Sequence, residues 1–198
     1  MGLFDNFSYQ NGNIVDKSWI KWYHFCVPDK EGPSREATRK WLKGLGHSSE
    51  CTSLSGCYFI KNKTPKRELS ESELLHPNCD CLMINIAKPK DEIVANCDLR
   101  KFTDYVFGKK YASNGKIKLL LSLGFEKEDS LYLKQQLDLQ AKEKYLNGEY
   151  ELGNLNEYGQ RINITIQLSS KTKRNISLIT GWLVHPLGKI TCNTPLGG

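Results

Sequence analysis

The strongest constraint on the fold is a change of hydrophobic period after residue 160. In RINITIQL (161–168), apolar side chains occupy every second position: Ile162, Ile164, Ile166 and Leu168. This alternation is typical of a half-buried β-strand. SSKTK makes a turn, NISLITGWLV (175–184) supplies a second strand, HPLG turns again, and KITCNT (189–194) supplies a third. The carboxyl-terminal segment therefore predicts a three-stranded antiparallel meander.

Three helical patterns precede the meander. LRKFTDYVF (99–107) places Leu99, Phe102 and Val106 on one stripe, and GKIKLLLSLGF (115–125) ends at Gly124. EDSLYLKQQLDLQAKEKYLNG (128–148) repeats apolar residues every three or four positions and stops at Asn147-Gly148. Helices followed by a small antiparallel sheet predict an α+β fold, with the helices packed on one sheet face.

The first 90 residues show no sustained period. SREATRKWLKGLG (34–46) predicts one helix with Ser34 as its N-cap. The stretch 47–90 holds four cysteines and many turn-forming residues, which indicates an irregular Cys-rich segment. KPKDE (88–92) is a boundary signal, so we expect a Cys/His-containing region at 1–90 and an α+β domain at 91–198.

Charge and apolar patterning limit the environment and the partners. No apolar run approaches the ~18–20 residues that span a bilayer, and the first residues lack a Sec signal pattern. We therefore expect no membrane partner and a cytoplasmic location, or delivery into a target cell by a route without a Sec signal. Seven cysteines, an odd number, favour reduced thiols over a purely disulfide-built scaffold.

The net charge of +6 is concentrated near the carboxyl end. Residues 160–198 contain no Asp or Glu, and their cations are Arg161, Lys171, Lys173, Arg174 and Lys189. A surface of one sign favours a polyanion such as RNA through counterion release. The alternative is a solvated strand face with no ligand.

The segment LLHPNCDC contributes to a candidate zinc site. His76, Cys79 and Cys81, with Cys51 and Cys57 upstream, offer up to five zinc ligands. The gaps between them depart from the usual spacing of about two to four residues. Unligated thiols with a His-Pro turn, or disulfides, are the alternatives. A zinc deaminase is excluded because its H-x-E and P-C-x-x-C motifs are absent, and Asp80 disfavours a nucleophilic thiolate at its neighbours.

Two segments resemble known families. LLHPNCDC is similar to the HPxCRC-type signature of phage Mu F-like minor head proteins, which also appears ahead of bacterial polymorphic toxin domains, although Asp80 stands where those versions carry Arg. Residues 93–195 resemble an uncharacterised tail-domain family of polymorphic toxins, in LRKFTDYVF, NGKIKLLLSLGF, EYGQRINITIQL, ISLITGWLV and KITCNTP. That family's last strand more often ends like PRLVTAYP, so only Thr194-Pro195 matches there.

The resemblance implies a toxin-like activity on RNA. Helices followed by a small sheet also resemble the barnase–EndoU–colicin–RelE class of metal-independent ribonucleases, so the implied enzyme needs no cofactor for catalysis. A cognate immunity protein is the implied protein partner. No GxGxxG or GxxxxGK[ST] loop is present, so we expect no nucleotide cofactor.

Metal-free RNA cleavage needs a base, an acid and cations around the phosphate. His185 lies on the turn between two predicted strands, Arg174 opens the preceding strand, and Thr194 ends the last one. Lys118 is a further candidate through the family resemblance. The alternative is that these are ordinary turn and strand-end residues. Two other functions stay open: a phage- or prophage-derived structural or zinc-binding module without activity, and a nucleic-acid-binding module without catalysis.

Overall fold

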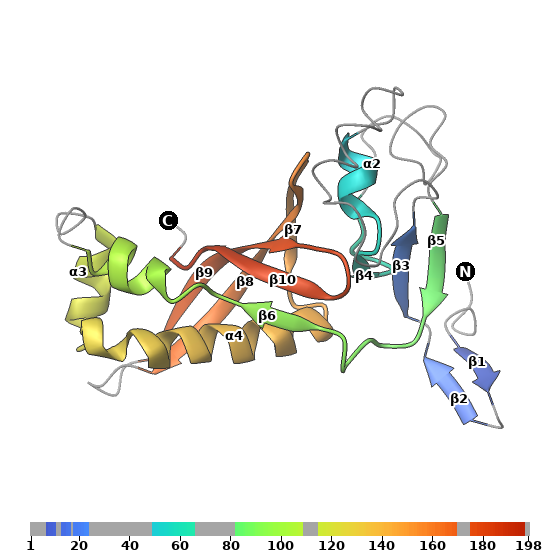
Figure 1. Cartoon of the computed structure of the whole chain (residues 1–198). Helices are drawn as coiled ribbons and strands as arrows, with labels where there is room; N and C mark the ends of the chain where they lie inside the picture. Colours follow the sequence, from blue (N-terminus) through green and yellow to red (C-terminus); the bar gives the residue numbers. More distant parts are fainter. Residues whose placement is uncertain are drawn as a thin grey trace. The chain divides into compact units, whose positions relative to one another are not determined.

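The computed structural model in Figure 1 describes residues 7–10, 13–16, 18–23, 49–65, 82–108, 115–169 and 175–196. The chain forms two compact units. The first comprises Met1–Ile93, Leu152–Arg161 and Val184–Lys189, and the second comprises Val94–Glu151, Ile162–Leu183 and Ile190–Gly198. These compact units do not test the predicted division into two domains, 1–90 and 91–198, which stays a prediction. No helix in the described ranges is long and apolar enough to cross a membrane.

A five-stranded sheet contains the predicted meander. The strands β8 (Gly159–Ser169), β9 (Asn175–Val184) and β10 (Lys189–Thr194) confirm the three predicted ones. The strand order is β6-β10-β9-β8-β7, so β6 (Val94–Asn96) and β7 (Glu151–Asn156) are added at the two edges. The sequence pattern does not show these two strands because β6 has three residues and β7 has no buried alternation. The fold class is α+β, as predicted.

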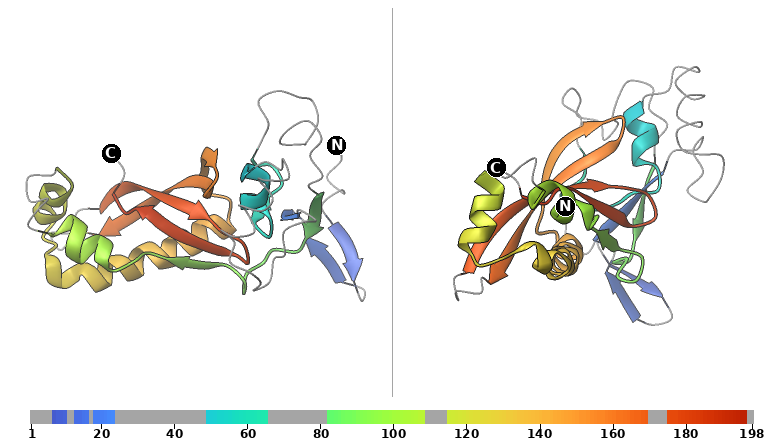
Figure 2. Two further views of the ribbon diagram at one scale, coloured as in Figure 1. Left: turned by 45° about the horizontal axis from the view of Figure 1, so that its top comes forward. Right: turned by 60° about the vertical axis from the view of Figure 1, so that its left-hand side comes forward.

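One face of the sheet is covered by the long helix α4 (Ser130–Leu146), which runs along it in Figures 1 and 2. Its buried stripe consists of Ser130, Leu133, Leu137, Ala141 and Tyr145. The alternate residues of β8 that the sequence places on one face are all buried: Ile162, Ile164, Ile166 and Leu168. The apolar side chains that recur every 3.6 residues in α4 and every second residue in β8 therefore form one apolar layer.

Trp182 lies in this core and is fully buried. Its indole Nε1–H donates to Thr180 Oγ1 at 2.8 Å, and the Thr180 hydroxyl donates to the carbonyl of Ile164 at 2.8 Å. Both buried polar groups are therefore satisfied across β9 and β8, which a buried indole requires.

The other helical patterns give shorter elements. The predicted helix at 115–125 is α3 (Gly115–Ser122), and Gly124 follows it at φ +81, as expected for a glycine beyond a helix end. The 3₁₀ turn η3 (Lys127–Asp129) precedes α4. The predicted α-helix at 99–107 is instead one π-helical turn, η1 (Lys101–Val106), because Phe107 N–H donates to Phe102 O, five residues back, at 2.8 Å.

The first unit contains regular structure where the sequence indicates an irregular segment. A three-stranded antiparallel sheet has the order β4-β3-β5, from β3 (Trp19–Tyr23), β4 (Tyr58–Ile60) and β5 (Leu82–Ile86). The hairpin of β1 (Phe7–Gln10) and β2 (Asn13–Asp16) and the helix α2 (Ser49–Leu54) also belong to this unit, as do most of β7 and the first residues of β8. Strands of three to five residues are too short to show a clear period. The predicted helix at 34–46 lies outside the described residues.

Candidate functional site

A cleft of about 400 Å³ lies in the second unit, between the η1 segment and the end of β10. Two segments far apart in the sequence form its lining: Asp98, Arg100, Lys101, Asp104 and Tyr105 from the first, and Asn193, Thr194 and Pro195 from the second. The buried side chains of Phe102 and Val106 hold η1 in place, and the charged residue between them, Asp104, is exposed. The cleft therefore collects charged and hydroxyl side chains on a fixed backbone.

Arg100 and Asp98 form an ion pair at the cleft. Arg100 Nη2 lies 2.6 Å from Asp98 Oδ2, Nε donates to both carboxylate oxygens, and the Arg100 backbone N–H donates to Oδ1 at 2.9 Å. The hydrogen bonds from the Arg100 side chain, and then from its backbone, lower the pKa of Asp98 to about 2. The same pairing raises the pKa of Arg100. Asp98 therefore stays ionised down to low pH and is a weak base.

Lys101 connects the two sides of the cleft. Its Nζ donates to the backbone carbonyl of Asn193 at 2.9 Å. An ammonium has three donors, and this bond uses one of them. Lys101 is half-buried, so its charge is held beside β10 and its other N–H groups can face a phosphate.

Asp104 and Tyr105 add a carboxylate and a phenol to the lining of the cleft. The exposed Asp104 carboxylate accepts a hydrogen bond from the Thr103 hydroxyl at 2.7 Å. Tyr105 is 38% exposed. A carboxylate, a phenol and two cations around one cleft are the types of group that metal-free phosphoryl transfer uses.

Of the sequence-predicted catalytic residues that the structure describes, Thr194 lines this cleft and the others do not. It ends β10 and packs over Gly181 of β9, where a side-chain carbon built on the glycine would lie 3.5 Å from Thr194 Cβ. The missing side chain at position 181 gives Thr194 room at the strand end.

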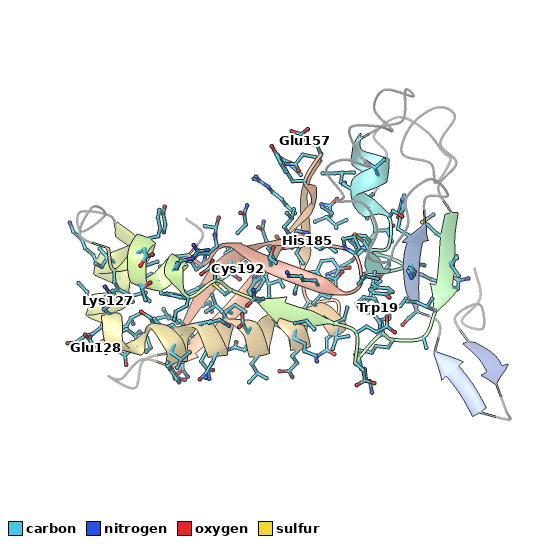
Figure 3. All side chains as sticks on the ribbon, viewed as in Figure 1. Trp19, Lys127, Glu128, Glu157, His185 and Cys192 are labelled. Carbon is cyan, nitrogen blue, oxygen red and sulfur yellow. The ribbon has the colours of Figure 1, made fainter. Side chains whose placement is uncertain are left out.

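The other predicted catalytic residues lie elsewhere. Lys118 is exposed on α3 and is not among the lining residues of the cleft. His185 lies in the β9–β10 turn, where its backbone N–H donates to Lys189 O at 2.8 Å; Figure 3 labels it. His185 precedes β10 and Thr194 ends it, so the strand, about 20 Å long, separates them. Arg174 lies outside the described residues.

The predicted zinc ligands are described only in part. Cys57 is fully buried, and its thiol donates to the carbonyl of Ser53 at 3.6 Å. Cys51 lies in α2, and His76, Cys79 and Cys81 lie outside the described residues. The described part of the chain holds no group of three or more His, Cys, Asp or Glu side chains suited to a metal ion. The zinc site therefore stays a prediction.

Comparison with known proteins places the second unit in a family. The model of the family described as a domain of unknown function, DUF6883, matches residues 89–192, more than half of the chain. The chain belongs to the DUF6883 family. No curated protein and no solved structure matches it.

The DUF6883 match covers only one side of the cleft in full. It includes β6, η1, α3, α4 and the strands β7 to β9, and it ends at Cys192, one residue before Asn193. The cleft residues that sequence reasoning missed, Arg100, Lys101, Asp104 and Tyr105, all belong to LRKFTDYVF and its matched flank. In the sequence these residues stand between the apolar positions of a short helical pattern. Any solvated helix face has the same pattern, so it does not single out a site.

Proposed function

We propose that this DUF6883 protein is a toxin-like domain that acts on RNA as a metal-independent ribonuclease, with the cleft between η1 and β10 as its active site. The observation that carries the proposal is the convergence of Lys101, Arg100, Asp104, Tyr105 and Thr194 on one cleft. These residues include a base, an acid and cations, which the reaction requires in the absence of a metal.

The sheet beside the cleft supports a polyanionic substrate. The outward side chains of β8, β9 and β10 in the second unit include no carboxylate; the exposed ones are Asn163, Thr165, Gln167, Ser169, Asn175, Ser177, Ile179 and Asn193. A phosphodiester chain on this face meets hydrogen-bonding groups and no like charge, which favours its approach.

The proposed role of each cleft residue follows from the chemistry of its side chain. Asp104 takes the proton of the ribose 2′-hydroxyl, whose oxygen attacks the neighbouring phosphorus while the 5′-oxygen leaves. Tyr105 donates a proton to that leaving oxygen, and Lys101 stabilises the negative charge on the non-bridging oxygens. Asp98 is a poor general base because its hydrogen bonds with Arg100 lower its pKa to about 2.

The test is cleavage of tRNA, rRNA and mRNA by the purified chain in excess chelator. We expect products with 2′,3′-cyclic phosphate ends, and a loss of kcat/KM of about 100-fold or more in Lys101→Ala and Asp104→Asn. Lys127→Ala is the matched control, because Lys127 is exposed on η3 and does not line the cleft. An absence of cleavage in all three RNAs would refute the ribonuclease.

The residues expected from sequence enter the same assay. If His185→Ala or Lys118→Ala lost RNA cleavage while Lys101→Ala kept full activity, the active site would lie outside the cleft. The toxin resemblance further predicts a cognate immunity protein, which would inhibit the wild-type enzyme at equimolar concentration.

A binding module without catalysis is the second candidate, and the carboxylate-free sheet face favours it as much as it favours an enzyme. Salt-dependent binding of RNA with no turnover in the same samples would select this function.

A further inference from the structure

Two buried cysteines meet behind the cleft. Cys97 follows the last residue of β6, and Cys192 lies in β10, the neighbouring strand of the sheet. Both are free thiols, 0% and 4% exposed. The Cys97 thiol donates to the carbonyl of Asp98 at 3.9 Å, and the influence of Cys97 on Cys192, together with burial, raises the pKa of the Cys192 thiol. Neighbouring strands lie about 4.8 Å apart, which matches the Cα separation that a disulfide spans.

The thiol pair is joined directly to both sides of the cleft. Cys97 precedes Asp98, and Cys192 precedes Asn193, so each cysteine is adjacent in sequence to a lining residue. The Cys97 backbone N–H donates to Asp138 Oδ1 of α4 at 2.6 Å, which fixes the position of Cys97. The two segments are also joined by the pairing of β6 with β10 and by the exposed hydrogen bond from Lys101 Nζ to Asn193 O.

We infer that Cys97 and Cys192 form a reversible disulfide that fastens the η1 side of the cleft to β10. The oxidant is a small disulfide of the glutathione class. One protein thiolate attacks a sulfur of that disulfide, forms a mixed disulfide and releases the first reduced thiol. The second protein thiolate then attacks the mixed disulfide and releases another. Two protein thiols are oxidised, and one small disulfide is reduced to two thiols.

Formation of the bond requires a local opening of the sheet edge. Both thiols are buried, and a raised pKa at Cys192 lowers its thiolate fraction. Because β6 is a three-residue edge strand with exposed Val94 and Asn96, it is the element that can separate from β10. We therefore expect oxidation over hours rather than seconds.

The test is disulfide mapping of the full chain after incubation with oxidised glutathione. Free thiols are alkylated in denaturant, and the digest is analysed by mass spectrometry without reduction. We expect a linked pair of peptides that contain Cys97 and Cys192, a mass loss of two hydrogens, and reversal by dithiothreitol. Cys57→Ser is the matched control because Cys57 is also buried but hydrogen-bonds to Ser53 O; the link should form in it unchanged.

A second measurement is the thermal unfolding of the wild type before and after oxidation. The bond would close a loop of about 95 residues, so the melting temperature of the oxidised wild type should rise by about 5 °C or more and return after reduction. Cys97→Ser should show no such change. Two free thiols at positions 97 and 192 after prolonged oxidation, or linkage of either to another cysteine, would overturn the inference.

The disulfide and the proposed function are tested separately, because the linked peptides and the melting shift do not depend on RNA cleavage. A mapped disulfide in a protein without ribonuclease activity would refute the proposed function alone, and an active ribonuclease without the link would refute this inference alone.

Discussion

The charged residues of the cleft differ in what they can do, and the difference comes from their immediate partners. Asp98 and Arg100 neutralise each other through a bidentate contact, whereas Lys101 is bonded to a neutral carbonyl and keeps its full charge. The Asp104 carboxylate accepts only a hydroxyl hydrogen bond among the contacts that the described structure gives it. Lys101 and Asp104 are therefore the better candidates for acting on a phosphate.

The first prediction concerns the titration of Asp98. Its pKa should be about 2 by carboxyl-carbon NMR, and Arg100→Ala should raise it toward the ordinary value of 3.8. Because the folded pKa lies below the unfolded one, the pair stabilises the fold above about pH 4, and this contribution is lost as the pH falls toward 2. Arg161→Ala, on β8, should leave the value unchanged. A wild-type midpoint near 3.8 would contradict the ion pair.

Gly188 carries the second prediction. It has φ +75, next to Leu187 at φ +58, and a side-chain carbon there would lie 2.3 Å from the carbonyl oxygen of Glu92. Gly188→Ala should lower the free energy of unfolding by about 2 kcal/mol or more, measured by urea denaturation. Gly181→Ala is the control, because its nearest contact is 3.5 Å. Equal stability of the two variants would contradict the turn geometry.

Among the elements, η1 shows how a local pattern can give an unexpected backbone. Phe102 and Val106 are buried four residues apart, as in an α-helix, yet Phe107 N–H reaches back to Phe102 O. The wider π-helical turn places Arg100, Lys101, Asp104 and Tyr105 along the cleft. Such turns occur frequently at functional sites, which agrees with the site proposed for this element.

The third prediction concerns the contact of α4 with the sheet. β8 has eleven residues and its hairpin partner β7 has six, so the far end of β8 extends beyond β7. The Gln140 amide completes that edge: it donates to Gln167 O at 2.7 Å and accepts from Gln167 N–H at 2.9 Å. Gln140→Ala should speed hydrogen exchange at Gln167 and cost about 1 kcal/mol of stability.

The control for this change is Gln135→Ala, on an exposed position of the same helix. It removes an identical side chain from a position other than the one that hydrogen-bonds to Gln167, so exchange at Gln167 should stay slow. Equal exchange rates in the two variants would show that Gln140 does not close the edge.

For the whole molecule, charge distribution decides which ligands approach. The chain carries +6, and residues 160–198 contain no carboxylate. Such a field attracts a polyanion, but only fixed cations in contact with phosphates set the salt dependence of binding. The contribution of the overall charge to RNA binding can therefore be separated by experiment from that of the cations in the cleft.

The fourth prediction uses this separation. Binding of a single-stranded RNA with 2′-O-methyl groups, which cannot be cleaved, should weaken linearly with the logarithm of salt concentration. Lys101→Ala should reduce the magnitude of that slope by about 0.7, because one phosphate contact is lost. Lys127→Ala keeps the cleft intact and should leave the slope near the wild-type value. Identical slopes for wild type and Lys101→Ala would remove Lys101 from the interface.

Local patterns were enough to predict the central elements. The alternation of Ile162, Ile164, Ile166 and Leu168 predicted β8, and the helical stripe of Leu133, Leu137 and Ala141 predicted α4, because both periods express burial on one face. The turn at HPLG and the stop at Gly124 were also local. The edge strands β6 and β7 carry no such pattern, since few of their residues are buried.

The amino-acid sequence by itself determined the α+β class, the order of its central elements and the basic character of the last 39 residues. Only the tertiary structure decided which side chains share a site. It brings residues 98–105 beside 193–195 and Cys97 beside Cys192, while His185 and Thr194 remain at opposite ends of β10. These residues become neighbours because strands from distant segments pair. The local periodicity of the sequence does not specify which strands pair.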